Sequence, residues 1–96
     1  MYHTIEITEQ AEQELDESYN WYQDQSYGLG DRFLEAIQRC LEKIDQYPET
    51  FRIFYRSQRQ AQVQGFPFIV SFEIRGTVIL VHAVFHTRRD PRNKLR

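Results

Sequence analysis

The most apolar part of the chain lies between residues 66 and 86, where two strand-like runs are separated by only two residues. Phe66–Ile74 carries apolar side chains at alternate positions, and Thr77–His86 is apolar at both odd and even positions. The intervening Arg75-Gly76 has the length of a tight β-hairpin turn. A strand that is apolar on both faces must be covered on both, so we expect this hairpin near the middle of a sheet. Strict alternation would place Ile79, Val81, Ala83 and Phe85 on one face of the second strand and Val78, Leu80 and Val84 on the other.

A short strand and a first helix open the chain. Tyr2–Ile7 alternates between apolar and polar residues and predicts a strand, after which Thr8 is a suitable N-cap for a helix from about Glu9 to Gln25. The narrow apolar stripe of this helix consists of Ala11, Leu15, Ser18 and either Trp21 or Tyr22. Such a helix must dock on another element to persist.

A second helix follows a reversal at Ser26–Gly30, whose two glycines allow a tight turn. Asp31 is a suitable cap for this helix, which we expect to end before Pro48. Its stripe consists of Phe33, Ala36, Ile37, Cys40, Leu41 and Ile44. Because the connection is short, the two helices should form an antiparallel hairpin. Cys40 lies within the stripe, so we expect a core residue rather than a nucleophile.

The segment between the helices and the β-hairpin has a weaker pattern. Arg52–Arg56 is consistent with a strand, Ser57–Gln60 with a turn, and Ala61 with the start of a strand that continues through Gly65. Pro67 cannot donate a ladder hydrogen bond and should mark a strand start, a bulge or an edge. The order β-α-α-β-β-β predicts an α+β fold, with the helical hairpin packed on one face of a mostly antiparallel, twisted sheet. We expect residues 1–96 to form a single domain.

The composition limits the class of protein. Seven Phe and six Tyr in 96 residues help a small sheet to exclude water, and such residues also suit a partner surface. The single cysteine excludes an internal disulfide. The polar segment Met1–Gln10 does not resemble a signal peptide, and no apolar run approaches the roughly 18–20 residues of a membrane span. We therefore expect a cytoplasmic protein that does not contact a membrane.

The net charge of −2 conceals a strong division between the two halves of the chain. Residues 1–50 carry twelve acidic and three basic side chains, whereas residues 51–96 carry two acidic and nine basic ones. If the halves occupy different faces, the protein has one acidic and one basic surface. The basic surface would then meet an anionic partner, or the charges simply keep two polar faces hydrated.

No residue pattern typical of a metal, cofactor or nucleophile site is present. His82 and His86 lie four residues apart in one predicted strand, roughly 13 Å from each other, which is too far to hold one ion. No serine lies in a nucleophile-elbow motif, and no glycine-rich phosphate loop occurs. We therefore expect neither a metal nor a cofactor.

Basic and aromatic residues collect in the second half of the chain, many of them after the last predicted strand. This rim consists of Arg52, Tyr55, Arg56, Arg59, His86, Arg88, Arg89, Arg92, Lys94 and Arg96. Arginines beside imidazole or phenol groups can bind phosphates, and in a nuclease they can stabilise the transition state. They can equally bind an acidic protein surface, so composition alone leaves both functions open.

Short motifs occur in a specific order along nearly the whole chain. They include Trp21-Tyr22, Gly28-Leu29-Gly30, Phe33, Tyr47-Pro48, Phe66-Pro67-Phe68-Ile69-Val70-Ser71-Phe72 and the ending Ala83-Val84-Phe85-His86-Thr87-Arg88-Arg89-Asp90-Pro91. In this order and spacing the chain resembles the RelE/ParE superfamily of bacterial toxins. The resemblance implies the toxin of a type II toxin–antitoxin pair, which a cognate antitoxin neutralises by laying a helix or an extended segment across the toxin's hydrophobic surface.

Within that superfamily, RelE-like members cleave mRNA on the ribosome, and ParE-like members have been linked to poisoning of DNA gyrase. The resemblance implies that RelE-like cleavage needs two arginines and a C-terminal tyrosine, which by position fall on Ile69, on Arg88 and near Lys94. Isoleucine cannot hydrogen-bond a phosphate, and lysine lacks the aromatic hydroxyl. The sequence therefore favours the ParE-like branch and a toxin that is not an enzyme.

We accordingly expect a toxin that binds DNA gyrase and forms a hetero-oligomer with its antitoxin. The residues expected to bind the target are Arg56, Arg59, His86, Arg88, Arg89 and Arg92. One alternative is a ribosome-dependent mRNA endonuclease with His86 and Arg88 as its candidate catalytic residues; another is a degenerate, non-toxic interaction module. The residues that bind the antitoxin are not identified, but we expect an exposed groove between the helical hairpin and the sheet edge.

Overall fold

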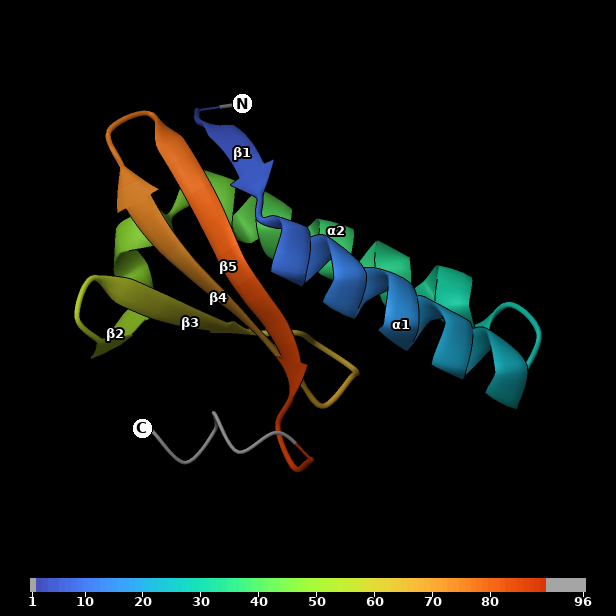
Figure 1. The fold of residues 1–96 in the computed structure, drawn as a ribbon. Helices are drawn as coiled ribbons and strands as arrows, with labels where there is room; N and C mark the ends of the chain where they lie inside the picture. The colour runs from blue at the N-terminus through green and yellow to red at the C-terminus, as the bar shows by residue number, and fades with distance from the viewer. Residues whose placement is uncertain (1, 90–96) are drawn as a thin grey trace.

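The computed structural model describes residues 2–89, in which two helices pack on one side of a sheet (Figure 1). The elements are β1 (Thr4–Ile7), α1 (Glu9–Gln25), α2 (Leu29–Gln46), the 3₁₀ turn η1 (Pro48–Thr50), β2 (Arg52–Tyr55), β3 (Gln58–Gln62), β4 (Phe68–Arg75) and β5 (Val78–His86). Within these residues the sheet has the strand order β1-β5-β4-β3-β2, with β1 parallel to β5 and the other pairs antiparallel. The predicted α+β fold is confirmed, with four strands after the helices rather than the three of the predicted order. Neither described helix combines the length and apolar character needed to cross a membrane.

The β4–β5 hairpin occupies the interior of the sheet, as its apolar pattern predicts. β5 lies between β1 and β4, and β4 lies between β5 and β3. Arg75 pairs with Val78, so the turn is Gly76-Thr77, one residue later than predicted. Gly76 adopts a φ of 60°, which a residue without a Cβ takes up readily.

A bulge in β5 changes which residues share a face. Phe72 pairs with Val81 and Ser71 pairs with Ala83, so His82 is an extra residue in β5. Beyond the bulge, the odd-numbered positions turn away from the helices. Ile79, Val81 and Val84 belong to the main core, whereas Ala83 and Phe85 form a separate small cluster with Ile69. The predicted division of β5 into two strictly alternating faces is therefore wrong.

The helices begin close to the predicted positions. The Thr8 hydroxyl accepts a hydrogen bond from the Ala11 N–H at 3.2 Å, which confirms it as the cap of α1. The prediction of Asp31 as the cap of α2 is wrong, because α2 begins at Leu29 and is preceded by Gly28 with a φ of 84°. The short reversal suffices for the two helices to lie antiparallel, as Figure 1 shows.

The β2–β3 region differs from the predicted pattern. Ser57–Gln60 was predicted to be a turn, but residues 58–60 already belong to β3, because their backbone pairs with β4 from Glu73 to Ser71. The reversal lies instead around Arg56, which has a φ of 54°. Residues 63–67 are irregular, so the predicted continuous strand is broken before β4. Cross-strand pairing, which no local pattern reveals, decides these boundaries.

An aromatic cluster joins the helices to the sheet. The Tyr22 ring centroid lies 5.3 Å from that of Phe33, and the Phe33 centroid lies 4.9 Å from that of Phe68. Phe33 is fully buried, and a buried phenylalanine contributes roughly 1.5–3 kcal/mol. Cys40 is buried in the same core, and burial raises the pKa of its thiol to about 11. The prediction of Cys40 as a core residue is confirmed.

The start of the chain is tied to the end of α2 by Asp45. Its carboxylate is buried, with 5% of the residue exposed, and accepts the backbone N–H groups of Tyr2 and His3 at 3.2 and 2.7 Å. Burial raises the pKa of this carboxyl. The hydrogen bonds from Tyr2 and His3 together lower the pKa by more than burial raises it, so the pKa lies below its usual value. Asp45 therefore anchors β1 beside α2.

Candidate macromolecule-binding site

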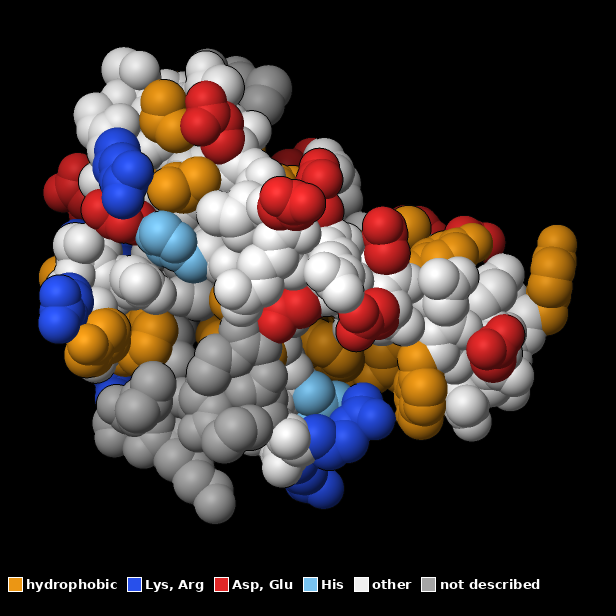
Figure 2. Space-filling model, viewed as in Figure 1, with side chains coloured by type: hydrophobic (Ala, Val, Ile, Leu, Met, Phe, Trp, Pro, Cys, Tyr) orange, Lys and Arg blue, Asp and Glu red, His pale blue; other side chains and the backbone are white. Residues whose placement is uncertain are grey.

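The clearest basic and aromatic cluster lies where β5 ends. It contains His86, Arg88 and Arg89 together with Trp21 of α1, whose ring centroid lies 5.0 Å from the Arg89 guanidinium carbon. Figure 2 shows basic side chains and a histidine gathered there beside hydrophobic side chains of the helical layer. Arg88, Arg89 and Trp21 are exposed, so the cluster is accessible to a partner. Arginine and tryptophan are common in the centres of protein interfaces.

His86 closes the turn that follows β5. Its Nδ1 accepts the backbone N–H groups of Arg88 and Arg89 at 3.1 and 3.2 Å. A ring nitrogen that accepts carries no proton, so the ring is neutral, with its hydrogen on Nε2. Burial lowers the pKa of His86, and the positive charges of Arg89 and Arg88 lower it further.

A shallow depression of about 250 Å³ lies between this turn and α1. Its lining includes Glu14 and Glu17 from α1 and His86 and Arg89 from the β5 end. The Glu14 carboxylate accepts the Val84 backbone N–H at 2.9 Å. This bond gives the Val84 N–H a partner at a point on β5 that β1 does not reach, so α1 covers the sheet edge beside the cluster.

The predicted site residues do not form one surface. Arg56 lies in the β2–β3 turn, next to the pairing of Gln58 with Glu73, whereas His86 pairs with Phe68. Phe68 and Glu73 are five residues apart on β4, which corresponds to roughly 17 Å. The structure thus separates the β5-end cluster from Arg56.

The two arginines near the β2–β3 turn have different roles. The Arg56 guanidinium is exposed and lies 5.2 Å from the Tyr55 ring centroid. Arg59 instead donates to the backbone carbonyl oxygens of Glu49 and Phe51 at 3.1 and 2.8 Å, which ties η1 to β3. Arg92, like Lys94 and Arg96, lies outside the described residues.

Ile69, which stands at the position of the first arginine needed for RelE-like cleavage, is apolar and buried. Ile69 is 3% exposed and packs with Ala83 and Phe85. A phosphate could neither reach this side chain nor be hydrogen-bonded by it.

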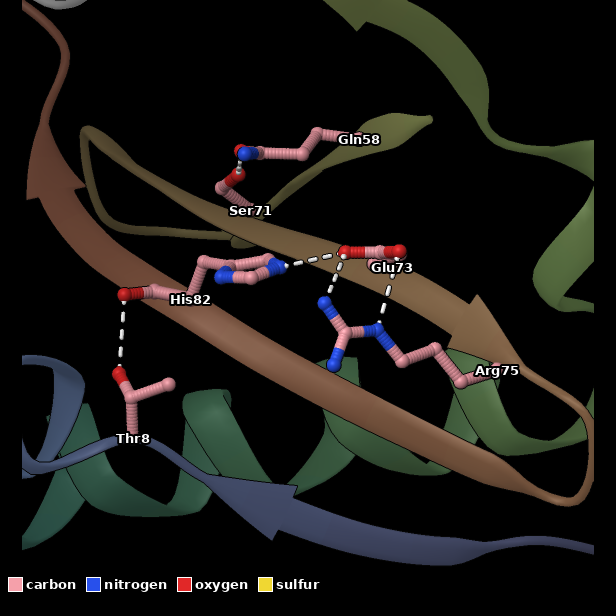
Figure 3. A network of polar contacts seen from close by, with 6 residues as sticks. All are labelled: Thr8, Gln58, Ser71, Glu73, Arg75 and His82. Carbon is pink, nitrogen blue, oxygen red and sulfur yellow. Dashed lines mark hydrogen bonds and ion pairs between the residues drawn. The ribbon is translucent and has the colours of Figure 1, made fainter. Parts of the chain in front are cut away.

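The sequence did not reveal a polar network on the helix-free face of the sheet (Figure 3). Glu73 accepts from Arg75 at 3.1 Å and lies 2.9 Å from His82 Nε2. The hydrogen bonds from Arg75 and His82 lower the pKa of Glu73 to about 2. The alternation of Ser71, Glu73 and Arg75 indicates a polar face, but the bulge that brings His82 to Glu73 has no sequence signal. Ser71 donates to Gln58 at 3.0 Å, so its hydroxyl is not directed to the histidine.

A groove of about 720 Å³ lies between β1 and α2, where the sheet has a free edge. It is lined by Tyr2, Ile5, Ile7, Gln38, Arg39, Leu41, Glu42, Lys43, Asp45 and Gln46. The Thr4 and Thr8 N–H groups donate to the carbonyl oxygens of Thr77, just before β5, and Val81 in β5, so the backbone groups of the alternate residues Ile5 and Ile7 point away from β5. The groove matches the exposed groove expected between the helical hairpin and the sheet edge.

The described residues contain no group of three or more His, Cys, Asp or Glu side chains that could hold a metal ion. The basic, aromatic and backbone groups of the β5-end cluster suit binding to another macromolecule.

Comparison with known proteins places these features in a family. The family model described as the ParE toxin of type II toxin–antitoxin systems, parDE, matches residues 5–91. No curated protein sequence matches the chain. Among solved structures, a chain of the chromosomal ParDE toxin–antitoxin system from P. aeruginosa is similar, with a TM-score of 0.66 and 18% identity. The similarity covers 88% of this chain and 96% of that one, and at this identity it supports the shared fold.

Proposed function

Because the chain belongs to the ParE toxin family of type II toxin–antitoxin systems, we propose that it inhibits DNA gyrase through the cluster at the end of β5. The observation that carries this proposal is the exposed pair Arg88 and Arg89, presented beside Trp21 at the end of an interior strand. A site on a rigid strand end presents charged groups in a fixed direction, which favours recognition of an acidic surface.

The geometry favours binding over RNA cleavage. A general base must be able to accept a proton, but His86 Nδ1 already accepts two backbone N–H groups. The first nuclease arginine is replaced by the buried Ile69. These two features support a toxin that binds its target without cutting a nucleic acid.

Supercoiling by purified gyrase tests the proposal. We expect the wild-type chain to inhibit supercoiling, and Arg88→Ala to weaken inhibition roughly 10–100-fold, because a charged hydrogen bond contributes about 1.5–3 kcal/mol. Arg32→Ala, which removes an exposed arginine from α2, is the matched control and should inhibit normally. Full gyrase activity at micromolar toxin would refute gyrase as the target. Cleavage of ribosome-bound message that is lost in Arg88→Ala would instead identify a nuclease.

We further propose that the antitoxin places an extended segment in the groove between β1 and α2. The free edge of β1 can accept a strand, and Ile5, Ile7 and Leu41 supply apolar contacts. Arg39 and Lys43 line the same groove beside Glu42 and Asp45. The Asp45 carboxylate already accepts the Tyr2 and His3 N–H groups, so the two bases can pair with acidic residues of the segment.

Charge reversal in the groove separates antitoxin binding from toxicity. The double substitution Arg39→Glu and Lys43→Glu should weaken antitoxin binding at least about 10-fold and leave gyrase inhibition intact. Arg32→Glu, on the same helix but outside this groove, is the control. Unchanged antitoxin affinity in the double variant would place the antitoxin elsewhere.

A further inference from the structure

Hydrogen bonds hold the turn after β5, residues 87–89, on both of its sides. His86 Nδ1 accepts the N–H groups of Arg88 and Arg89, and the Thr87 N–H donates to the Pro67 carbonyl at 2.8 Å. The His86 ring itself packs edge-on against Phe68, with the ring centroids 5.3 Å apart. The backbone from His86 to Arg89 is therefore attached both to its own histidine and to the segment that precedes β4.

The two arginines of this turn have different surroundings. The guanidinium of Arg89 lies over the Trp21 ring, which fixes the turn to α1. Within residues 2–89, the Arg88 side chain makes no hydrogen bond or ion pair, and it is exposed. The turn thus uses Arg89 as an anchor and presents Arg88 to solvent.

We propose that His86 is a positioning residue, whose neutral ring sets the direction of Arg88 and Arg89 by accepting their backbone N–H groups. Without that acceptor the two N–H groups lose their partner and the turn can open, so Arg89 would leave Trp21 and Arg88 would sample many directions. The functional part of this inference rests on the proposed role of the β5-end cluster. In this role the imidazole needs no proton transfer, unlike a catalytic histidine.

Replacing His86 with asparagine tests the positioning role separately from acid–base chemistry. Its side-chain carbonyl can accept N–H groups two and three residues ahead, as in Asx turns, but it does not titrate. His86→Asn should therefore keep the turn closed, and His86→Ala should open it. His82→Ala removes the other histidine of β5, which binds Glu73 on the opposite face of the sheet, and serves as the control.

The single tryptophan of the chain is a built-in reporter of the turn. We expect the emission of Trp21 in His86→Ala to change toward that of Arg89→Ala, and amide exchange at residues 88 and 89 to rise at least 10-fold. Wild type, His86→Asn and His82→Ala should share one emission spectrum. Unchanged emission and unchanged exchange in His86→Ala would overturn the proposal.

The pH dependence supplies a second readout. Glu14 and Glu17 on α1 line the same depression as His86, and Arg88 and Arg89 carry the charges of its own turn, while Phe68 on β4 is uncharged. Protonation of Nδ1 removes the acceptor, so acid should open the wild-type turn. In His86→Asn, the Trp21 emission and the amide exchange at residues 88 and 89 should not show this acid transition, although Glu14 and Glu17 remain. An identical transition in both proteins would overturn the proposal.

Gyrase inhibition tests the functional consequence. We expect His86→Ala to weaken inhibition at least 5-fold and His86→Asn to recover to within about twofold of wild type. If the asparagine variant is as weak as the alanine variant while its turn is closed, the ring contacts the target or acts chemically, and positioning is refuted. If wild type does not inhibit gyrase but His86→Ala still opens the turn, the positioning role stands and the gyrase target falls.

Discussion

Gly30 allows the two helices to approach each other closely, and replacing it with alanine should separate them. A Cβ at this position would lie 2.7 Å from the Tyr19 carbonyl oxygen, 2.8 Å from Gln23 Oε1 and 2.9 Å from Tyr19 Cδ1. Ordinary carbon–oxygen contacts begin near about 3.3 Å, so the methyl group is about 0.6 Å too close to the backbone of α1. Gln23 could rotate away, but it would then lose its hydrogen bond with the Gly30 N–H, which is 2.9 Å long.

The expected cost follows from these contacts. Overpacking typically costs about 1–3 kcal/mol, and the lost hydrogen bond about 1 kcal/mol. Alanine regains roughly 0.5–1 kcal/mol through its higher helix propensity. Gly30→Ala should therefore lower the free energy of unfolding by about 1–3.5 kcal/mol, which corresponds to a fall in Tm of at least about 4 °C for a domain of this size.

Gly28→Ala is the matched control, because a Cβ there meets no atom within 4 Å. Its φ of 84° still disfavours alanine, by about 1–2 kcal/mol, so this variant shows strain without a clash. Thermal and urea unfolding of the three proteins measure both effects. A Tm for Gly30→Ala equal to or above that of wild type would refute the close contact between the helices.

Three further outcomes test the core and the polar network. Phe72 is fully buried in β4, so Phe72→Ala should lower the free energy of unfolding, measured in urea, by about 3–5 kcal/mol. A decrease below about 1 kcal/mol would contradict the place of Phe72 in the core. The pKa of Glu73 is lowered from 4.5 to about 2, so its contribution to stability is present above about pH 4.5 and disappears as pH falls toward 2. The Tm difference between wild type and Glu73→Gln should therefore shrink over this range, and a pH-independent difference would argue against the Arg75 and His82 bonds. With a thiol pKa of about 11, Cys40 carries roughly a thousandth of its population as thiolate at pH 8, so iodoacetamide should label it only in urea, and rapid labelling in buffer would show an open core.

Local patterns in the sequence determined the parts of the fold that depend on neighbouring residues. The stripe of α2, the Thr8 cap and the close spacing within the β4–β5 hairpin all follow from helix periodicity, N-cap chemistry and strand alternation. The buried position of Cys40 follows from the same stripe. These features involve contacts only a few residues apart along the chain, so their signals are visible in a single sequence.

The tertiary structure decided how the candidate site is assembled. The bulge at His82 exchanges the faces of β5, and Arg59 donates hydrogen bonds to backbone carbonyl groups. Arg56 lies near the Glu73 end of β4, far from His86, which pairs with Phe68. Trp21 meets Arg89 only because α1 folds back over the end of β5. Cross-strand register and helix docking depend on residues distant in the chain, so no periodicity reveals them. The sequence thus identified the basic residues at the end of β5 but not Trp21 as their neighbour, and three-dimensional packing brought Trp21 and Arg89 together.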